Sequence, residues 1–563
     1  MHFQDELAKH IAAATQLSAE KIAAFLEIPP DKKLGDFAFP CFSLGKNPHE
    51  AAEQLKEKVQ LPPFIAKAAV IGPYLNFFFS LPHLAEATLT EVYQQADFYG
   101  KQDLGKGKKI VLEFSSPNIA KPFGIGHLRS TVIGNCLYKV FSFLGYALIS
   151  VNHLGDWGTQ FGKLLVAYKK WGNKAALERE PVQHLLEIYV RFHKEAEQHP
   201  ELEDEAREAF KKLEEGDKAS LELWELFREL SLEEFRRFYR ILDVEFDTYH
   251  GEAFYNPLLD ETVKKMQHKD LATISEGALI VDLQKWNMPP LMLRKSDGTS
   301  IYHTRDLAAA FYRLRHYKPI KVIYVVGSEQ KLHFQQLFKV LELAGVKKDL
   351  FTHVDFGLFR FPEGKMSTRK GNVIFLEEVL DKAVALARKV IEEKNPALQQ
   401  KEEVAKQVGV GAILFADLSA DRVRDVEFSW EKMLSFEGET GPYVQYTHAR
   451  ACSILRKAQK EHNLGVSPLV NFATFNLEEE RAVLALLAGF PDVLQKVAET
   501  YKPHHLAQHL IALSQAFNEF YHKCPVISEQ MHTMKGRLLL VQSVRQVLKN
   551  GLQLLGMKAP EEM

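Results

Sequence analysis

The feature that most constrains the fold is a strand-like run that ends in a glycine-rich turn and continues into a helix. The apolar stretch "KKIVLEF" begins at Lys108, the turn "KPFGIGH" covers 121–127, and helical spacing follows from about 126. Further apolar runs ("ALISVNHLG", "KVIYVVGS", "HVDFGLF") alternate with helical stretches. Strands that alternate with helices are typical of a parallel sheet, because the helices provide the crossovers. We therefore expect an α/β domain with the turn at its sheet edge.

The rest of the 563-residue chain divides around this α/β pattern into further regions. Residues 1–105 are expected to form an α+β module, with a helix in "DELAKHIAAATQL" and a strand candidate in "AVIGPYLNFFFSL". Residues 106–375 hold the parallel-sheet pattern. After 376 the spacing is almost entirely helical, so we expect linking helices over 376–433 and an all-α helical bundle over 434–563. The protein is thus predicted to be multidomain.

A highly charged helical stretch interrupts the α/β pattern over about 173–240. An exposed helical insertion is the simpler interpretation, and a partner-binding arm is the alternative. Its sequence contains no feature that we can interpret as hydrolytic, so we do not expect a proofreading domain there.

Composition excludes several classes of protein. Acidic and basic residues nearly balance, with a formal net charge of -2, so any nucleic-acid surface has to be a local patch. No apolar run approaches 18 residues, which argues against a membrane span, and the N-terminus lacks the pattern of a secretion signal. We expect a cytoplasmic protein.

His505 and His509 have the spacing of metal ligands but no third partner, and no metal site is predicted. The cysteines lie too far apart to suggest a zinc ribbon or a disulfide framework: Cys41, Cys136, Cys452 and Cys524.

The glycine-rich turn is suited to binding an anion. The first N–H groups of a helix are unpaired and its dipole favours negative charge, while Gly124 and Gly126 would let a phosphate approach the backbone. The turn lacks the third glycine of a dinucleotide fingerprint, and no P-loop pattern occurs, so NAD and P-loop sites are disfavoured. A tight helix entry with glycines chosen for packing remains the alternative.

A second stretch, "FPEGKMSTRKGN" at 361–372, makes a phosphate site more plausible. Lys365, Arg369 and Lys370 stand there in a loop flanked by glycines. A cationic loop opposite a helix N-terminus could stabilise the charge that develops on an α-phosphate as pyrophosphate leaves. The two stretches together indicate a nucleotide-activating site.

Together these motifs resemble those of a known family. "GIGH" and "KMSTR" stand where class I aminoacyl-tRNA synthetases carry their two signatures, and "EFSSPNIAKPFGIGHLRST" closely resembles the arginyl-tRNA synthetases. Further stretches resemble that family in the right order, namely "NHLGDWGTQFGKL", "YHTRDLAAA", "GSEQKLHFQQLF", "GPYVQYTHAR" and the ending "LKNGLQLLGMKAPEEM".

The resemblance implies a fold and a reaction. It implies a Rossmann-like catalytic domain over 106–375, an N-terminal module over 1–105 that touches the tRNA D-loop, linking helices over 376–433 that contact the stem, and an anticodon-binding domain over 434–563. The implied reaction activates L-arginine with ATP, in the presence of Mg²⁺, and transfers the arginyl group to the terminal adenosine of tRNA(Arg). Members of the family lean towards the monomeric state, and activation is expected to require bound tRNA.

The resemblance also implies roles for individual residues. A guanidinium has five donors and no acceptor, so its pocket needs carboxylates and planar acceptors. Tyr302 and Asp306 are four apart and would share a helix face. Taken singly, each could be structural, Tyr302 at a core edge and Asp306 on the surface. The implied arginine-binding residues are Glu113, Asn118, Tyr302, Asp306 and Gln330, the ATP-binding residues are Gly124, Gly126, His127, His333, Gln336, Met366 and Ser367, and the catalytic residues are His127, Lys121 and Lys365.

The sequence departs from the family signatures at two positions. Glycine stands at 124 where the signature has histidine, and Thr368 stands where it has lysine. Arginyl enzymes often carry a lysine just before the turn, here Lys121. Our hypothesis is that Lys121 supplies the missing cation.

RNA contacts are expected in the C-terminal bundle and the N-terminal module. Splayed bases stack on aromatic rings and pair through their edges. An aromatic stripe at helical spacing can equally be core, as Phe517 and Tyr521 illustrate. The candidate RNA-binding residues are Tyr443, Gln445, Phe517, Asn518, Tyr521, Met563, Asn76 and Phe78.

Two other functions remain open on the sequence. A catalytically decayed, synthetase-like RNA-binding or regulatory protein is suggested by the missing histidine at Gly124, and opposed by the retention of Glu113, Asp306 and the other pocket residues. A class I synthetase for another amino acid would not be expected to carry Tyr302 and Asp306 at this spacing.

Overall fold

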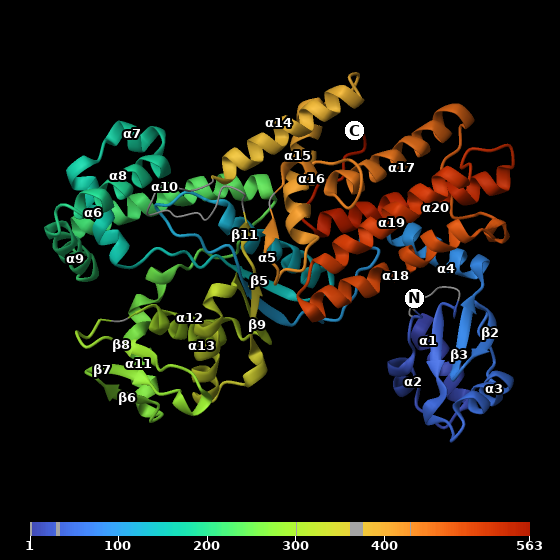
Figure 1. Ribbon diagram of the computed structural model, residues 1–563, viewed down its shortest axis with the longest axis horizontal. Helices are drawn as coiled ribbons and strands as arrows, with labels where there is room; N and C mark the ends of the chain where they lie inside the picture. Colours follow the sequence, from blue (N-terminus) through green and yellow to red (C-terminus); the bar gives the residue numbers. More distant parts are fainter. Residues whose placement is uncertain (1–2, 30–33, 300, 361–374, 428) are drawn as a thin grey trace.

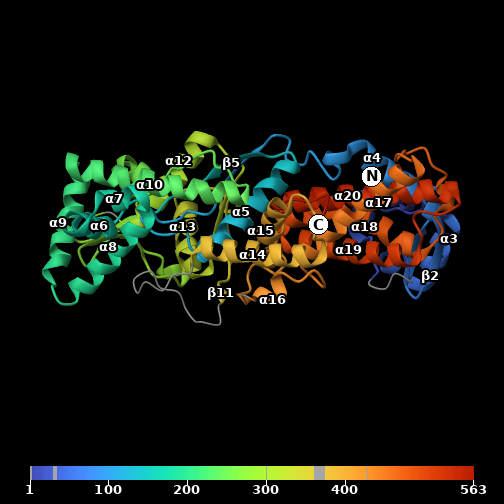
Figure 2. The ribbon, with the colours of Figure 1, turned by 90° about the horizontal axis from the view of Figure 1, so that it is seen from above.

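The computed structural model describes residues 3–29, 34–299, 301–360, 375–427 and 429–563. A small parallel sheet lies at the centre of the molecule, between a group of helices on one side and a helical bundle on the other (Figure 1). The view from above shows an elongated molecule with α6–α9 at one end and α17–α20 at the other (Figure 2). The multidomain α/β fold predicted from the sequence is confirmed.

The central sheet is parallel throughout and has the strand order β10-β9-β4-β5. Its strands are β4 Lys109–Glu113, β5 Ala147–Val151, β9 Lys321–Gly327 and β10 Phe351–Phe356. Strand β4 pairs with β5 on one side and with β9 on the other. The chain crosses over from β4 to β5 and later returns to the opposite side of β4 as β9, so the strand order reverses at β4. Ligands bind parallel sheets where the order reverses, outside the carboxyl ends of the strands. This places the expected site next to Glu113, the last residue of β4.

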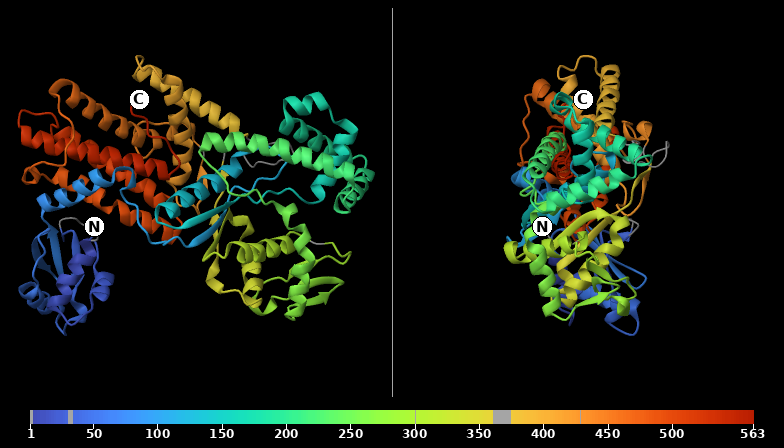
Figure 3. Two further views of the ribbon diagram at one scale, coloured as in Figure 1. Left: turned by 180° about the vertical axis from the view of Figure 1, so that it is seen from behind. Right: turned by 90° about the vertical axis from the view of Figure 1, so that its left-hand side faces the viewer.

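The glycine-rich turn follows β4 directly and leads into α5, Ile125–Phe143. Gly134 lies in the middle of this helix, and a Cβ there would come within 2.2 Å of the Phe114 ring, so only glycine lets α5 pack this closely on the end of β4. Seen from behind, α5 runs from the sheet towards the C-terminal bundle (Figure 3).

The charged stretch predicted as an insertion is helical. It contains α7 Lys174–Arg179, α8 Pro181–Ala196, α9 Glu201–Glu214 and α10 Lys218–Leu242, and α6 Thr159–Trp171 precedes it. Helix α10 does more than cover the surface, because Tyr239 bonds Ser115 Oγ at 2.8 Å and accepts from Asn152 Nδ2 at 2.8 Å. The insertion therefore holds two segments of the active-site edge together.

A smaller unit precedes β9. A three-stranded antiparallel sheet in the order β6-β7-β8 packs beside α11 and α12. The bounds are α11 Leu259–His268, β6 Ala272–Ser275, β7 Ala278–Val281, β8 Leu291–Arg294, α12 Tyr302–Tyr317 and α13 Lys331–Leu343.

The N-terminal module is an antiparallel sheet in the order β1-β3-β2, with helices against it. The single strand expected in "AVIGPYLNFFFSL" is wrong: Gly72, at φ 60°, turns the chain between two strands, since glycine adopts this conformation easily. Arg481 of the bundle donates to the Phe79 carbonyl and so ties the module to the C-terminal region. The elements are α1 Phe3–Ala14, α2 Ala19–Phe25, β1 Phe37–Pro40, α3 Pro48–Lys58, β2 Ile65–Ile71, β3 Tyr74–Phe79 and α4 Leu81–Gln95.

The C-terminal region is helical, as predicted. Two short strands precede or interrupt it, β11 Phe359–Arg360 and β12 Val426–Glu427, which pair in parallel. The helices are α14 Leu376–Lys394, α15 Lys401–Leu418, α16 Trp430–Met433, α17 Gly441–His462, α18 Glu478–Thr500, α19 His504–Lys523 and α20 Met531–Leu554.

One buried arginine joins the catalytic sheet to the linking helices. Arg129 of α5 is 1% exposed, and its Nε lies 2.7 Å from Asp417 Oδ1 on α15. Its Nη1 donates to the carbonyls of Gly357 and Arg424 at 2.7 and 3.0 Å. These carbonyls flank β11 and β12, so Arg129 holds the segment that leads into 361–374 against the helix that carries the glycine-rich turn.

Candidate active site

The glycine-rich turn presents a neutral imidazole. Gly124 is the N-cap of α5, and its backbone N–H donates to His127 Nδ1 at 3.2 Å. In a neutral histidine the other ring nitrogen then carries the proton. Burial, together with the nearby charge of Lys121, lowers the pKa of His127 to about 4, which keeps the ring neutral near pH 7. His127 Nε2–H is therefore available as a donor.

The two glycines of the turn differ in their surroundings. Gly126 is exposed, and a Cβ at this position would contact nothing within 4 Å, which leaves the first turn of α5 open to a ligand. Gly124 is buried, with φ -86°, a conformation open to any residue. Its backbone forms an antiparallel bridge with Phe375. Phe375, the first described residue after 361–374, is thus fixed against the turn, whereas Lys365, Met366 and Ser367 lie outside the described residues.

Lys121 lies between the turn and the helical insertion. Its Nζ is 6.0 Å from the centre of the Tyr189 ring on α8. It lines a cavity of about 460 Å³ together with Thr159 and Lys163 of α6 and His193 of α8. A cation in this open cavity next to His127 is in a position to meet an anion bound at the turn.

A second cluster surrounds the start of α12. Asp306 accepts a charge-assisted contact from His333 Nε2 at 2.7 Å, and its other oxygen faces His153 Nε2 at 3.7 Å. Burial acts to raise the pKa of Asp306, but the His333 hydrogen bond and the charge of Arg313 outweigh it and hold this pKa below its usual value. The Asp306 side chain is 25% exposed, so a ligand can reach an ionised carboxylate.

Glu113 closes the base of the same pocket. Its carboxylate lies 2.5 Å from Arg313 Nη2, and both side chains are almost fully buried. Asn118 packs at the pocket edge: its backbone bridges to Gly155, where a Cβ would come within 2.1 Å of Asn118 Oδ1. Both residues therefore lie at the carboxyl edge of the sheet, in keeping with the arginine-binding roles that the resemblance implies for them.

Glu252 is a pocket residue that the sequence analysis missed. Burial and then the Asp306 carboxylate raise its pKa to about 8, against the opposing charge of Arg305. Two carboxylates that repel each other in a partly buried site favour a cation between them. The stretch "HGEAF", an acid after a glycine outside any helix or strand pattern, was the available signal, although it has no fixed spacing from the other motifs.

Two guanidinium groups around this pocket already pair with carboxylates, and a third, that of Arg305, donates to Asn256 Oδ1 at 3.1 Å. Arg313 pairs with Glu113, and Arg228 Nε lies 3.2 Å from Asp156 Oδ2. The direct contacts of Asp306 within the described chain are instead two histidines. Asp306 is thus the carboxylate best placed to receive an incoming cation.

The other pocket residues fall into two groups. Tyr302 is 53% exposed, stacks on His303 with 4.0 Å between ring centres, and lies 5.2 Å from the ring of His333, which contacts Asp306. Gln330 is exposed at the N-cap of α13. His333, expected near ATP, contacts Asp306 and belongs to the acidic pocket. Gln336, also expected near ATP, is buried and donates to the Pro289 carbonyl at 2.8 Å, so its amide braces a loop and we do not carry it into the ATP site.

A polar and aromatic cluster joins α17 and α19. Asn518 Nδ2 donates to the Tyr443 hydroxyl at 2.9 Å, and Arg450 donates to Asn518 Oδ1. The Arg450 guanidinium lies over the rings of Tyr446 and Tyr521, at 5.0 and 5.7 Å. Tyr446 and Arg450 were missed from the sequence, although both stand in the quoted "GPYVQYTHAR". Partly exposed aromatic rings beside a cation form a surface suited to unstacked bases.

Several RNA candidates lie elsewhere or are covered. Gln445 and Phe517 have no exposed surface, and Gln445 donates to the carbonyls of Gln407 and Lys558, so we do not carry these two into the RNA surface. Met563 packs beside α14 and α15. In β3, Phe78 is partly exposed with Lys67 Nζ 4.5 Å from its ring centre, whereas Asn76 is only 3% exposed.

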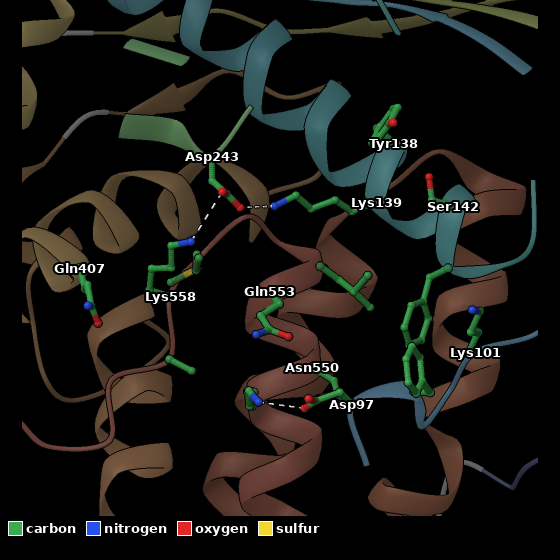
Figure 4. A pocket seen from close by; sticks show the side chains of 16 residues that line it. Asp97, Lys101, Tyr138, Lys139, Ser142, Asp243, Gln407, Asn550, Gln553 and Lys558 are labelled. Carbon is green, nitrogen blue, oxygen red and sulfur yellow. Dashed lines mark hydrogen bonds and ion pairs between the residues drawn. The ribbon is translucent and has the colours of Figure 1, made fainter. Parts of the chain in front are cut away.

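A cavity of about 680 Å³ lies away from the acidic pocket, where the catalytic sheet meets the bundle (Figure 4). Asp243, just after α10, accepts from Lys139 of α5 at 2.6 Å and faces Lys558 of the C-terminal tail at 3.5 Å. This junction connects the helix that begins at the glycine-rich turn with the last residues of the chain.

Within the described residues, no group of three or more histidine, cysteine, aspartate or glutamate side chains is arranged to hold a metal ion. No helix in the same part of the chain is long and apolar enough to cross a membrane.

Comparison with known proteins gives matches over almost the whole chain. The model of the tRNA synthetases class I (R) catalytic domain matches residues 88–430, that of the DALR anticodon binding domain matches 444–563, and that of the arginyl tRNA synthetase N terminal domain matches 1–79. The arginine–tRNA ligase of Clostridioides difficile is 49% identical over 553 residues, which cover 97% of each chain. That of Halothermothrix orenii is 47% identical over the same share.

Solved structures agree with these matches. The arginyl-tRNA synthetase of Thermus thermophilus superposes with a TM-score of 0.84 at 27% identity and covers all of both chains. The enzyme from Plasmodium falciparum gives a TM-score of 0.80 at 26% identity, over 96% of this chain and 94% of its own.

Proposed function

The chain belongs to the arginyl-tRNA synthetases, and from this we propose how its residues divide the family reaction between them. The enzyme activates arginine with ATP and transfers the arginyl group to tRNA. The single observation that carries the residue assignment is Asp306, an accessible, ionised carboxylate whose direct neighbours are histidines. Arg313 and Arg228 of the same pocket pair with other carboxylates. The side chain of arginine supplies the charge that complements Asp306.

Arginine lies with its guanidinium between Asp306 and Glu252 and beside the exposed ring of Tyr302. Binding of the cation favours the ionised form of Glu252, whose pKa is raised by burial and by the Asp306 carboxylate. Arg313 holds Glu113 at the pocket base, and Asn118 and Gln330 border the opening. A shorter amine such as lysine would leave buried acceptors unpaired, so the pocket discriminates against it without proofreading.

ATP binds at the first turn of α5. Gly126 leaves the helix N-terminus open, and His127 donates through Nε2 to phosphate oxygens. The carboxylate of arginine attacks the α-phosphate and pyrophosphate leaves, so the required protein contribution is to stabilise charge on the phosphates. Mg²⁺ enters with ATP as its phosphate complex. Lys121 adds a cation from the insertion side, and Lys365 is proposed to do so from its loop.

Replacing Lys121 with alanine is expected to lower the rate of arginine activation by about tenfold or more, because the variant loses a cation that meets the developing charge. Arginine-dependent pyrophosphate exchange measures this rate. The exposed Lys174→Ala variant on α7 serves as the matched control. A Lys121→Ala rate within about threefold of the wild type would contradict the role.

RNA recognition is assigned to two surfaces. The α17–α19 cluster, with Tyr443, Tyr446 and Asn518, takes anticodon bases, and Phe78 with Lys67 on the N-terminal sheet contacts the D-loop. The junction at Asp243 supports coupling between the anticodon region and the active site, since Asp243 contacts both α5 and the C-terminal tail. We also assign the enzyme to the cytoplasm as a monomer, as the family resemblance implies.

Charging of total tRNA with labelled arginine, lysine and glutamine tests the function. We expect label to be transferred from arginine alone, and pyrophosphate exchange to depend on added tRNA. Charging with lysine or glutamine would refute the assigned pocket, and exchange at the full rate without tRNA would refute the coupling.

A further inference from the structure

One oxygen of the Asp306 carboxylate accepts a hydrogen bond. Among the described residues, no donor lies within hydrogen-bonding distance of the other oxygen. His333 Nε2 lies 2.7 Å from Oδ2, a charge-assisted hydrogen-bond distance. Oδ1 faces His153 Nε2 at 3.7 Å, which is too long for a direct hydrogen bond. The two histidines therefore relate to the carboxylate in different ways, although both ring nitrogens point at it.

The hydrogen bond on the far side of the His153 ring explains the difference. His153 Nδ1 lies 3.1 Å from the backbone carbonyl of His250. A carbonyl can only accept, so Nδ1 carries a proton, and in the neutral form of the ring Nε2 then holds a bare lone pair. Nε2 and Asp306 Oδ1 are then two acceptors that face each other with no proton between them.

The surrounding structure holds this arrangement in place. The His153 side chain is only 11% exposed, and its ring packs 5.6 Å from that of Tyr255. The preceding residue, Asn152, is fully buried, with its backbone N–H bonded to the Thr248 carbonyl at 2.9 Å. These contacts restrict rotation of the His153 ring away from Asp306, so the packing of the pocket holds the two acceptors opposite each other.

We propose that His153 is a specificity-determining residue, which accepts a guanidinium N–H of arginine through Nε2 while the same terminal nitrogen donates to Asp306 Oδ1. Acceptors 3.7 Å apart can share the two protons of one terminal NH₂ group, each at an ordinary hydrogen-bond length. The proposal rests on the proposed function, in which Asp306 receives the guanidinium. His333 acts differently, as a positioning residue that fixes the Asp306 carboxylate.

Substitution of His153 combined with a modified substrate tests the proposal. We expect His153→Ala to raise the KM for arginine about 10- to 100-fold in pyrophosphate exchange, with the KM for ATP changed less than about twofold. A structural defect would move both constants together. His153→Gln, which restores an acceptor oxygen, is expected to recover part of the loss. His316→Ala, an exposed histidine in the last turn of α12, is the matched control.

The probe for the contact itself is Nω-methylarginine, in which a methyl group replaces one terminal N–H. In the wild type we expect methylation to raise KM by about tenfold or more, and in His153→Ala we expect this penalty to shrink to less than about threefold, because the lost contact is already absent. Equal methylation penalties in the two enzymes, or a His153→Ala KM for arginine within threefold of the wild type, would overturn the proposal. A wild-type enzyme that does not charge arginine would instead overturn the proposed function.

Discussion

The Asp306→Asn enzyme is expected to activate arginine with a kcat/KM about 100- to 1,000-fold below that of the wild type. The neutral amide removes the charge that the guanidinium meets and places an NH₂ group where an acceptor is needed. Truncating one member of a desolvated, hydrogen-bonded charge pair typically costs about 2–5 kcal/mol, or roughly 30- to 4,000-fold, and the expected loss lies within this range. Arginine-dependent pyrophosphate exchange at saturating ATP and tRNA gives the constant directly.

The loss should be confined to arginine. Asp306 does not contact the α5 turn, so we expect the KM for ATP to stay within about twofold and the far-ultraviolet circular dichroism spectrum to be unchanged. Asp381→Asn, an exposed acid on α14, controls for the removal of one negative charge from the enzyme. If Asp306→Asn reduced kcat/KM by less than tenfold, the guanidinium would have to bind elsewhere in the pocket.

Local sequence patterns were sufficient for the elements that depend on local interactions. The run "KKIVLEF" became β4, and the helical spacing after Gly124 became α5, because apolar periodicity and a helix N-terminus are properties of neighbouring residues. The hairpin at Gly72 was missed for a related reason. An apolar run of this length fits either one strand or two. Only the antiparallel pairing of β2 with β3, seen in the folded sheet, shows that there are two strands.

The acidic pocket depends on contacts that no local pattern contains. Asp306, His153 and Glu252 are brought together by the crossovers of the sheet and by α10, over separations of 54 to 153 residues in the chain. Resemblance supplied Asp306 because it lies in a recognisable motif. It supplied neither Glu252 nor the acceptor role of His153, since these depend on a raised pKa and on a hydrogen bond to a distant carbonyl. Sequence motifs located the pocket, and tertiary contacts determined its electrostatics.

Among the RNA-binding candidates of the C-terminal bundle, the sequence pattern named some residues that tertiary packing buries. Aromatic residues at helical spacing predict one face of a helix but not what covers it. Phe517 faces the core of the bundle, while Tyr521, one turn later, is 39% exposed and lies beside Arg450. The packing of α17 against α19 decides which ring is available to a base, and that packing is absent from either helix alone.

Arg129→Met is expected to lower the free energy of unfolding by about 3–5 kcal/mol, the usual effect of removing one partner from a buried ion pair. Asp417 is fully buried, and burial raises its pKa while Arg129 opposes that rise. Without the guanidinium, a carboxyl group and several backbone carbonyls are left unpaired in the core. Urea unfolding followed by tryptophan fluorescence measures the change, and the exposed Arg207→Met on α9 should leave the midpoint unmoved.

The double variant Arg129→Met/Asp417→Leu separates the charge from the packing. If the cost of the single change comes from a stranded carboxylate, an apolar pair should recover more than half of the lost stability. Catalysis should not recover, because the carbonyls of Gly357 and Arg424 still lack their donor. These carbonyls precede β11 and β12, and β11 leads into 361–374. Arg129 would then contribute to activation by holding the chain around β11 and β12 against α5, independently of its contribution to stability. Full recovery of both properties would show that Arg129 serves the fold alone.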